Sequence, residues 1–189
     1  DFTLQVGSAM GAGMYDWIKD SFDQGVVRKN GSIVAADFNW NEKSHRSISQ
    51  AFISSVTIPA LDAASKDAAY IKVTVTPLSD DVVQPSGQPI PPAGQKHWLP
   101  ANFVFEIDGV DTSRVASVDS FTWKCAVVED AQGVQRVSLD VSSIGVTFPR
   151  SILSSWQRWY DAHVTAGAND ERDGTLTLAG ASGAVITLD

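Results

Sequence analysis

The central signal in this chain is the stretch MYDWIKDSFDQG, residues 14–25. Its apolar side chains recur at helical spacing on one face, opposite a face of acids and one lysine. Gly25 then supplies the residue that commonly ends a helix. The stretch therefore predicts an amphipathic helix over about residues 13–23, whose apolar face contributes to the core through Met14, Trp17, Ile18 and Phe22.

The same pattern occurs a second time. Residues 2–25 align without a gap on residues 144–167, and the matched positions include Met14 with Trp156, Trp17 with Trp159, and Gly25 with Gly167. Each copy predicts a strand, an amphipathic helix, a glycine stop, a polar turn and another strand. The second helix is expected over about residues 151–164, with Trp156 and Trp159 in the core. Duplication of a whole supersecondary unit indicates assembly more than a unique catalytic pocket.

The remaining apolar pattern is typical of strands. Residues 69–77 alternate apolar and polar side chains, and residues 103–109 predict a strand that runs into an Asp-Gly turn. Residues 118–129 and 135–141 are rich in β-formers, and the segment 130–133 is expected to join them as a hairpin. We therefore expect a mainly β fold, an antiparallel β-sandwich or barrel that is internally duplicated, with one helix per unit.

A proline-rich stretch divides the chain. Residues 79–97 contain four prolines and show neither a helical nor a strand period, so they predict an extended, semi-rigid linker. The expected organisation is a first unit over residues 1–78, this linker, and a second unit over residues 98–189.

Composition excludes several classes of protein. The chain has 189 residues and a net charge of −8, and residues 98–189 carry twelve acids against six bases. Such an acidic surface is a poor docking site for duplex nucleic acid. The single Cys125 rules out an internal disulfide. No apolar run approaches the roughly 20 residues that cross a bilayer.

Three segments together resemble the tail-tube protein family of contractile phages, which also supplies the inner tubes of phage-tail-like injection particles. They are the helix segment 14–25, the following RKNGSIV at residues 28–34, and AFISSVTIPALDAASKD at residues 51–67. The strand and Asp-Gly turn at residues 103–109 is similar to the opening of family members. The resemblance covers most of the chain outside the linker, and it rests on the order and spacing of these motifs.

The resemblance implies a structural role. Family members form hexameric rings that stack into a tube, and strands of adjacent subunits close a continuous barrel around a channel for DNA or an effector. It further implies self-association, contacts with sheath, baseplate or tail-terminator proteins, and no sequence-specific binding of the cargo. The expected place is a virion tail or an extracellular phage-tail-like particle, assembled in the bacterial cytoplasm. No enzymatic activity, cofactor or metal is expected.

Neither unit is complete by the family pattern. Residues 1–78 hold the helix and the closing strands but not the opening half, and residues 98–189 hold the opening half and the helix but not the closing strands. Either the chain is a segment of a longer tandem protein, or the halves complement each other. In the second case, strands within residues 47–76 pair with residues 98–189 and residues 1–45 form an extra helical hairpin. Incomplete units expose strand edges that further protein must cover.

Candidate chemical motifs are better explained by local structure. The glycines of residues 7–13 lack the Gly-Lys-Ser/Thr ending of a phosphate loop and predict a strand-to-helix turn. Residues 169–174 lack the distal glutamate of a calcium loop and predict a solvated turn. The Asn30-Gly31 pair indicates a turn rather than a glycosylation site. Cys125 has no electropositive partners in sequence to activate it. His163 is expected to be a packed core or rim histidine on the apolar face of the second helix, and His45 and His97 are expected to be solvated.

The alternative function is a secreted or surface β-sandwich binding module, such as an adhesin or a carbohydrate binder. Six tryptophans permit this reading, because tryptophan rings serve as stacking platforms. Only Trp40 and Trp98 fall near loops and are expected to be exposed. Against this alternative stands the segment 58–67 beside a duplicated helix unit, which a generic lectin sandwich has no reason to carry.

Overall fold

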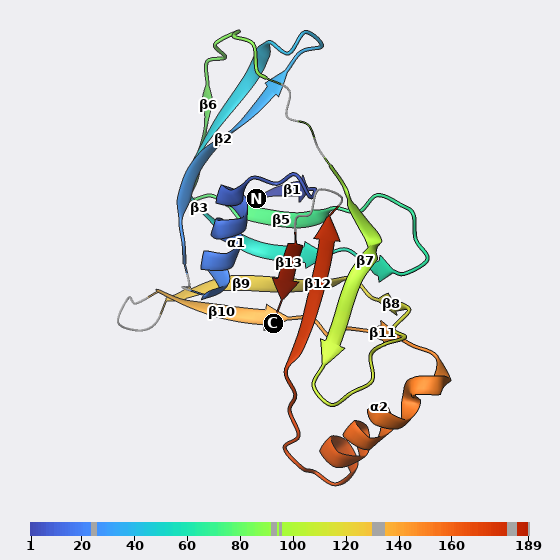
Figure 1. Cartoon of the computed structure of the whole chain (residues 1–189). Coiled ribbons are helices and arrows are strands. Elements are labelled where there is room, and N and C mark those ends of the chain that lie inside the picture. The colour runs from blue at the N-terminus through green and yellow to red at the C-terminus, as the bar shows by residue number, and fades with distance from the viewer. Residues whose placement is uncertain (24–25, 92–93, 95, 130–134, 181–184, 189) are drawn as a thin grey trace.

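The computed structural model describes residues 1–23, 26–91, 94, 96–129, 135–180 and 185–188. Over these residues the protein is mainly β, with antiparallel sheets and two α-helices (Figure 1). The hairpin expected at residues 130–133 and the helix stop at Gly25 lie outside the described residues.

The largest sheet has seven strands. Five of them follow the order β1-β5-β3-β9-β10, and β2 and β6 each pair with the long strand β3. Every pairing in this sheet is antiparallel. The strands are β1 (Phe2–Val6), β2 (Lys29–Ala36), β3 (Glu42–Ile58), β5 (Ile71–Thr76), β6 (Ser79–Val83), β9 (Phe121–Glu129) and β10 (Gln135–Val141).

Two smaller sheets complete the fold. One has the order β13-β12-β7, formed by β7 (Trp98–Ile107), β12 (Gly174–Gly180) and β13 (Val185–Leu188). The other has the order β11-β8-β4, formed by β4 (Leu61–Asp62), β8 (Ser117–Val118) and β11 (Val146–Thr147). In Figure 1 the strands β7 and β12 cross over the strands of the seven-stranded sheet.

One buried apolar cluster receives residues from both predicted units. The alternation in β5 buries Ile71, Val73 and Val75, as the sequence predicts. Leu176 and Leu178 of β12 join the same cluster. Its fifteen members are Trp17, Ala51, Ile53, Val56, Ile58, Leu61, Ala69, Ile71, Val73, Val75, Trp98, Val118, Phe121, Leu176 and Leu178.

The second alternative, in which the halves complement each other, corresponds in part to this topology. β3 pairs with β9 over residues 55–58, so strands of residues 47–76 and 98–189 share one sheet. Residues 1–45 are not a separate hairpin, however, because β1 pairs with β5 and the first helix packs into the common core.

The first helix is confirmed as α1 (Ala12–Asp23). Trp17 is 8% exposed and belongs to the core, and its Nε1 donates to the carbonyl of Val27 at 3.0 Å. Met14, Ile18 and Phe22 are partly buried and pack against the same cluster. The predicted apolar face therefore faces the core.

The second helix forms but lies outside the core. α2 (Leu153–Tyr160) follows a 3-10 turn (Arg150–Ile152) and continues into a π-helical turn (Asp161–Thr165). Trp156 and Trp159 are only partly buried and do not belong to the core cluster, contrary to expectation. The order strand, helix, strand recurs as expected, but β11 pairs with β8 and α2 projects beyond the sheets (Figure 1).

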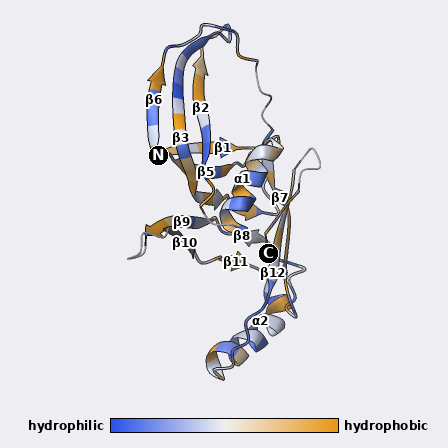
Figure 2. Ribbon diagram, turned by 90° about the vertical axis from the view of Figure 1, so that its left-hand side faces the viewer, coloured by the Kyte–Doolittle hydropathy of each residue, from blue (hydrophilic) through white to orange (hydrophobic). Residues whose placement is uncertain are grey.

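The predicted linker is partly a strand. Its first residues form β6, which pairs with β3 from Ser79 opposite Ser49 to Val83 opposite His45. β2, β6 and the first half of β3 make a three-stranded arm that rises away from the rest of the protein, the body (Figure 1). Figure 2 shows that hydrophobic residues also occur along the strands of this arm.

Gly7 directly follows β1, at a point where no side chain fits. A Cβ atom there would lie 1.7 Å from the carbonyl oxygen of Lys96. We expect Gly7→Ala to destabilise the protein by about 1–3 kcal/mol, because backbone must shift to admit the methyl group. Gly11→Ala, where the added atom meets nothing within 4 Å, is the matched control. Equal urea midpoints for the two variants would contradict this packing.

Candidate interaction surfaces

α2 is held against the rest of the protein by contacts of Ser155 and Trp156. Trp156 stacks on Phe148 with ring centroids 4.4 Å apart, and its Nε1 donates to the carbonyl of Asp111 at 2.9 Å. The buried Ser155 hydroxyl accepts the backbone N–H of Asp111 at 2.9 Å. These contacts dock the helix on the loop that follows β7.

A second set of contacts fixes the far end of the helix. Trp159 Nε1 donates to the carbonyl of Asp170 at 2.8 Å, and the Arg172 guanidinium lies 5.6 Å from the indole ring. Arg172 also donates to the Asp170 carboxylate at 2.8 Å and to the carbonyl of Asp108 at 3.0 Å. The positive φ of Gly167 ends the helical segment as the sequence predicts.

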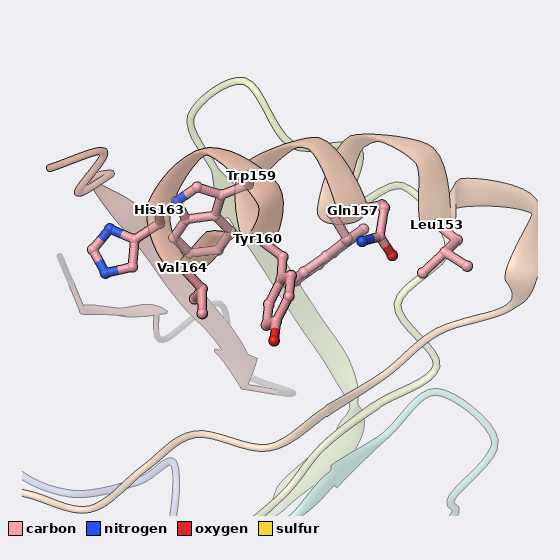
Figure 3. Close-up of a pocket in the computed structure, with 7 residues that line it drawn as sticks. Leu153, Gln157, Trp159, Tyr160, His163 and Val164 are labelled. Atoms are coloured by element: carbon pink, nitrogen blue, oxygen red, sulfur yellow. The ribbon is translucent and has the colours of Figure 1, made fainter. Parts of the chain in front are cut away.

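α2 bears an open apolar groove of about 420 Å³. Leu153, Tyr160 and Val164 are exposed there, although they are large apolar or aromatic residues. Figure 3 shows the side chains along one side of the helix. The groove is lined by Leu153, Trp156, Gln157, Trp159, Tyr160, His163 and Val164. Exposed apolar patches of this kind mark interaction sites in soluble proteins.

A second exposed aromatic surface lies at the tip of the arm. Phe38 is 98% exposed and Trp40 is 50% exposed. Trp40 has a φ of +63°, a conformation that bulky residues rarely adopt. The turn is held by Asp37, whose carboxylate accepts the backbone N–H groups of Asn39 and Asn41 at 2.9 and 3.0 Å. The tip therefore presents aromatic rings on an ordered turn.

The third surface is the pair of edges that bound the five-strand path. β1 carries no charge, proline or register shift, and β10 pairs with β9 without a shift. Asp80 and Asp81 in β6 and Pro100 in β7 oppose pairing at other edges, and β10 also carries two charged residues, Arg136 and Asp140. Leu139 and Val141 are exposed on β10, at 48% and 44%. The apolar face of the seven-stranded sheet therefore extends onto β10, where no described element covers it.

The residues considered in the sequence as candidates for phosphate binding, thiol chemistry or histidine function lie in separate parts of the fold. Of residues 7–13, residues 7–11 form the turn between β1 and α1, and residues 12 and 13 begin α1. Cys125 is buried, and this burial raises the pKa of its thiol. His163 is exposed and lies in the lining of the α2 groove, which fits the rim position of the two that were expected. Among the described residues, no group of three or more His, Cys, Asp or Glu side chains is placed to hold a metal ion.

The two tryptophans expected to be exposed differ. Trp40 is exposed at the arm tip, but Trp98 is 1% exposed and is the largest fully buried side chain. Backbone hydrogen bonds to Ala69 at 2.9 Å in both directions draw Trp98 into the body. The expectation of an exposed Trp98 was wrong. The neighbouring prolines indicate a loop, but they do not report which other elements pack on the tryptophan.

The sequence interpretation missed Phe38, Leu139 and Val141 as exposed apolar residues. Residues 138–141 alternate as a half-buried strand does, and this signal says which side chains share a face. It does not say whether another element covers that face. Phe38 lies in a polar turn, DFNWN at residues 37–41, where an aromatic residue is itself the available signal.

A scan against protein-family models found no match, and a search of curated proteins found none either. Within the described residues, none of the helices is both long enough and apolar enough to span a membrane.

Proposed function

We propose that this chain is a structural subunit of a phage or phage-tail-like tube, which assembles into stacked rings around a channel for DNA or effector passage. The observation that carries the proposal is that β1 and β10 lie at the two ends of one sheet path, each with an edge that no described strand pairs. The resemblance of residues 14–67 to tail-tube proteins supports the same function. The three antiparallel sheets contribute to one buried core, and this arrangement supports a sandwich of the tail-tube type.

The two edges are chemically compatible. On β1, Leu4 and Val6 pack against the core cluster, whereas Thr3 and Gln5 are exposed. On β10, Leu139 and Val141 lie opposite Cys125 and Trp123 of β9, on the core side of the sheet. Joining β10 of one copy to β1 of the next would continue the apolar layer on one face and the polar layer on the other.

The direction of the strands restricts how such a junction forms. The path β1-β5-β3-β9-β10 has an odd number of strands and is antiparallel throughout, so β1 and β10 run in the same direction. In a ring whose copies are related by rotation about an axis along the strands, β10 and the next β1 therefore pair in parallel. A two-fold dimer would instead pair two β10 strands in antiparallel.

The rest of the proposal follows from this role. The protein self-associates, contacts sheath, baseplate or terminator proteins at the ends of the tube, and passes DNA or protein cargo without reading its sequence. It acts in a virion tail or an extracellular phage-tail-like particle and has no catalytic activity. Its internal duplication makes it a tandem or permuted version of the tail-tube unit.

The proposal is tested by asking whether the parent protein assembles and whether a substitution in β10 prevents assembly. We expect the parent protein to form rings or stacked tubes in negative-stain electron microscopy, with a matching mass in light scattering. Leu139→Lys should give monomers, because a lysine on the edge opposes strand pairing. Leu78→Lys makes the same chemical change at a residue that is 75% exposed outside the proposed junction, and it should assemble normally.

Two results would contradict the proposal. The parent chain could remain monomeric over a wide concentration range, or Leu139→Lys and Leu78→Lys could assemble equally well. A monomeric parent would favour the alternative binding module, since the exposed Trp40 provides one stacking surface. A glycan-binding screen of the parent and Trp40→Ala would then decide whether that surface binds a carbohydrate.

A further inference from the structure

The arm and the body are joined by one strand that changes partners. β3 pairs with β2 and β6 over its first half, and with β5 and β9 over residues 52–58. Gln50 stands at the boundary with a φ of +50°, and the pairing of β2 with β3 shifts register between Lys29 and Gly31. Such an irregularity bends a strand.

The backbone of Gln50 is bound by side chains. Its N–H donates to Asn30 Oδ1 at 2.8 Å, and its carbonyl accepts from Arg28 Nη1 at 2.9 Å. Both contacts are exposed to solvent. Solvent-exposed side-chain bonds rearrange more easily than a buried ladder, so this boundary has the properties of a hinge.

A second connection links the arm to the body. After β6 reaches the arm tip, the chain leads back to β7, whose Trp98 is paired with Ala69 of the body. We call the described residues 84–91 of this connection the strap. In Figure 1 the arm tip, where the strap begins, lies above the start of β7. Because the strap is bonded to the arm and the chain then continues to a residue that pairs with Ala69, the strap can limit movement at the hinge.

The strap is attached to the arm tip by backbone bonds and one buried carboxylate. Ile90 N–H donates to the carbonyl of Trp40 at 2.7 Å, and Glu42 N–H donates to the carbonyl of Gln88 at 2.9 Å. The Glu42 side chain, in a residue that is only 7% exposed, accepts from the backbone N–H of Ser86 at 3.1 Å and from its hydroxyl. It thus binds the strap directly.

His45 completes the environment of Glu42. His45 Nδ1 lies 2.7 Å from Glu42 Oε1 and is the donor, because an ionised carboxylate only accepts hydrogen bonds. β2 places Ala36 opposite Glu42, and β6 places Val83 opposite His45. The charges of the turn, Asp37 and Lys43, pair with each other at 3.4 Å.

We propose that the arm is a hinged element that pivots at Gln50, and that Glu42 is the positioning residue that fastens the strap and so fixes the direction of the arm. With the strap fastened, the tip presents Phe38 and Trp40 at one defined place relative to the body. With the strap released, the tip covers a range of positions. This device stands on intramolecular contacts alone and does not depend on the proposed tube function.

The device responds to acid. The hydrogen bonds from Ser86, and next those from His45, hold the pKa of the Glu42 carboxyl below its ordinary value despite its burial. A carboxyl whose pKa is lowered by folding stabilises the folded contact above its ordinary pKa, and this stabilisation is lost as the pH falls through the lowered value. The strap should therefore remain fastened at neutral pH and release below the ordinary glutamate pKa of about 4.3.

The experiment measures the strap and the arm separately in the full chain. Hydrogen exchange reports on residues 84–91, and spin labels at Val82→Cys and Asp67→Cys, in a Cys125→Ala background diluted with unlabelled protein, report the distance between arm and body. In Glu42→Gln we expect strap exchange to accelerate at least about tenfold and the distance distribution to broaden. Asp80→Asn, which removes the exposed Arg46–Asp80 pair of the same arm, is the matched control and should match the parent.

Each other outcome overturns part of the device. If strap exchange accelerates but the distance distribution stays narrow, the strap does not direct the arm. If neither changes, or if the parent is already as broad as the variant, Glu42 does not fasten it. If exchange in β5 also accelerates, the variant has loosened the body, and Ser86→Ala, which removes only the hydroxyl donor, takes its place with the same expectations. As the pH is lowered stepwise below about 4.3, strap exchange in the parent should rise toward that of Glu42→Gln.

Discussion

Replacing Trp98 with alanine is expected to destabilise the fold by about 3–5 kcal/mol, the range for a large buried aromatic. The side chain is 1% exposed and lies opposite Gly180 of β12, where an added Cβ would come within 3.2 Å of the indole ring. Loss of the ring would leave a cavity in the core cluster beneath β7 and β12. Urea denaturation followed by circular dichroism measures the loss.

Trp98→Phe is the matched control for this prediction. Phenylalanine keeps most of the apolar volume and also removes Nε1, which is buried with no hydrogen-bond partner among the described residues. The cost of that unsatisfied donor is about 1–3 kcal/mol, so removing it offsets part of the lost packing. We therefore expect the phenylalanine variant to be clearly more stable than the alanine variant. An alanine variant within about 1 kcal/mol of the parent would show that the site is not tightly packed.

Trp17→Ala is expected to destabilise the protein by about 3–5 kcal/mol, whereas Trp159→Ala should cost only about 1–2 kcal/mol. Trp17 packs in the core and donates to Val27 at 3.0 Å, and Lys29 Nζ lies 5.9 Å from its ring. Trp159 is partly exposed on α2 and loses mainly its contacts with Asp170 and Arg172. Denaturation at low protein concentration compares the two variants.

The low concentration matters because assembly can bury the α2 groove. In dilute, monomeric protein the two variants should differ in their free energy of unfolding. In a concentrated sample the destabilisation by Trp159→Ala should be larger if another copy of the chain or a partner covers the α2 groove. Equal costs in dilute solution would mean that α2 packs into a core, as the duplicated sequence pattern alone predicts.

The sequence predicts the elements well where the signal is local. The spacing of Met14, Trp17 and Phe22 is sufficient to predict α1 and the face that it buries. Alternation predicts β5 and the positions that it buries, and the Asp-Gly pair predicts the turn after β7, where Gly109 has a φ of +70°. The second helix is likewise predicted in its position, although not in its burial.

The candidate surfaces were much less predictable. Trp40 was expected to be exposed, but the matched tryptophans Trp17 and Trp159 occupy different environments, and Trp98 is buried. β6 shows no strand period because Asp80 and Asp81 interrupt it, and it forms because β3 offers a free edge. The hydrogen bond between Glu42 and Ser86 joins residues 44 positions apart, which no local pattern reports.

The sequence by itself therefore determined both helices, the strands with an alternating pattern such as β5, and which side chains of these elements share a face, but not β6. The tertiary structure alone decided which of these faces is covered, which strands lie at an edge, and where the strap meets the arm. The physical reason is that periodicity follows from backbone geometry within one element, whereas burial depends on contacts between residues that are far apart in the chain. Leu139 and Val75 belong to similar alternating patterns, and only the packing of other elements leaves one exposed and the other in the core.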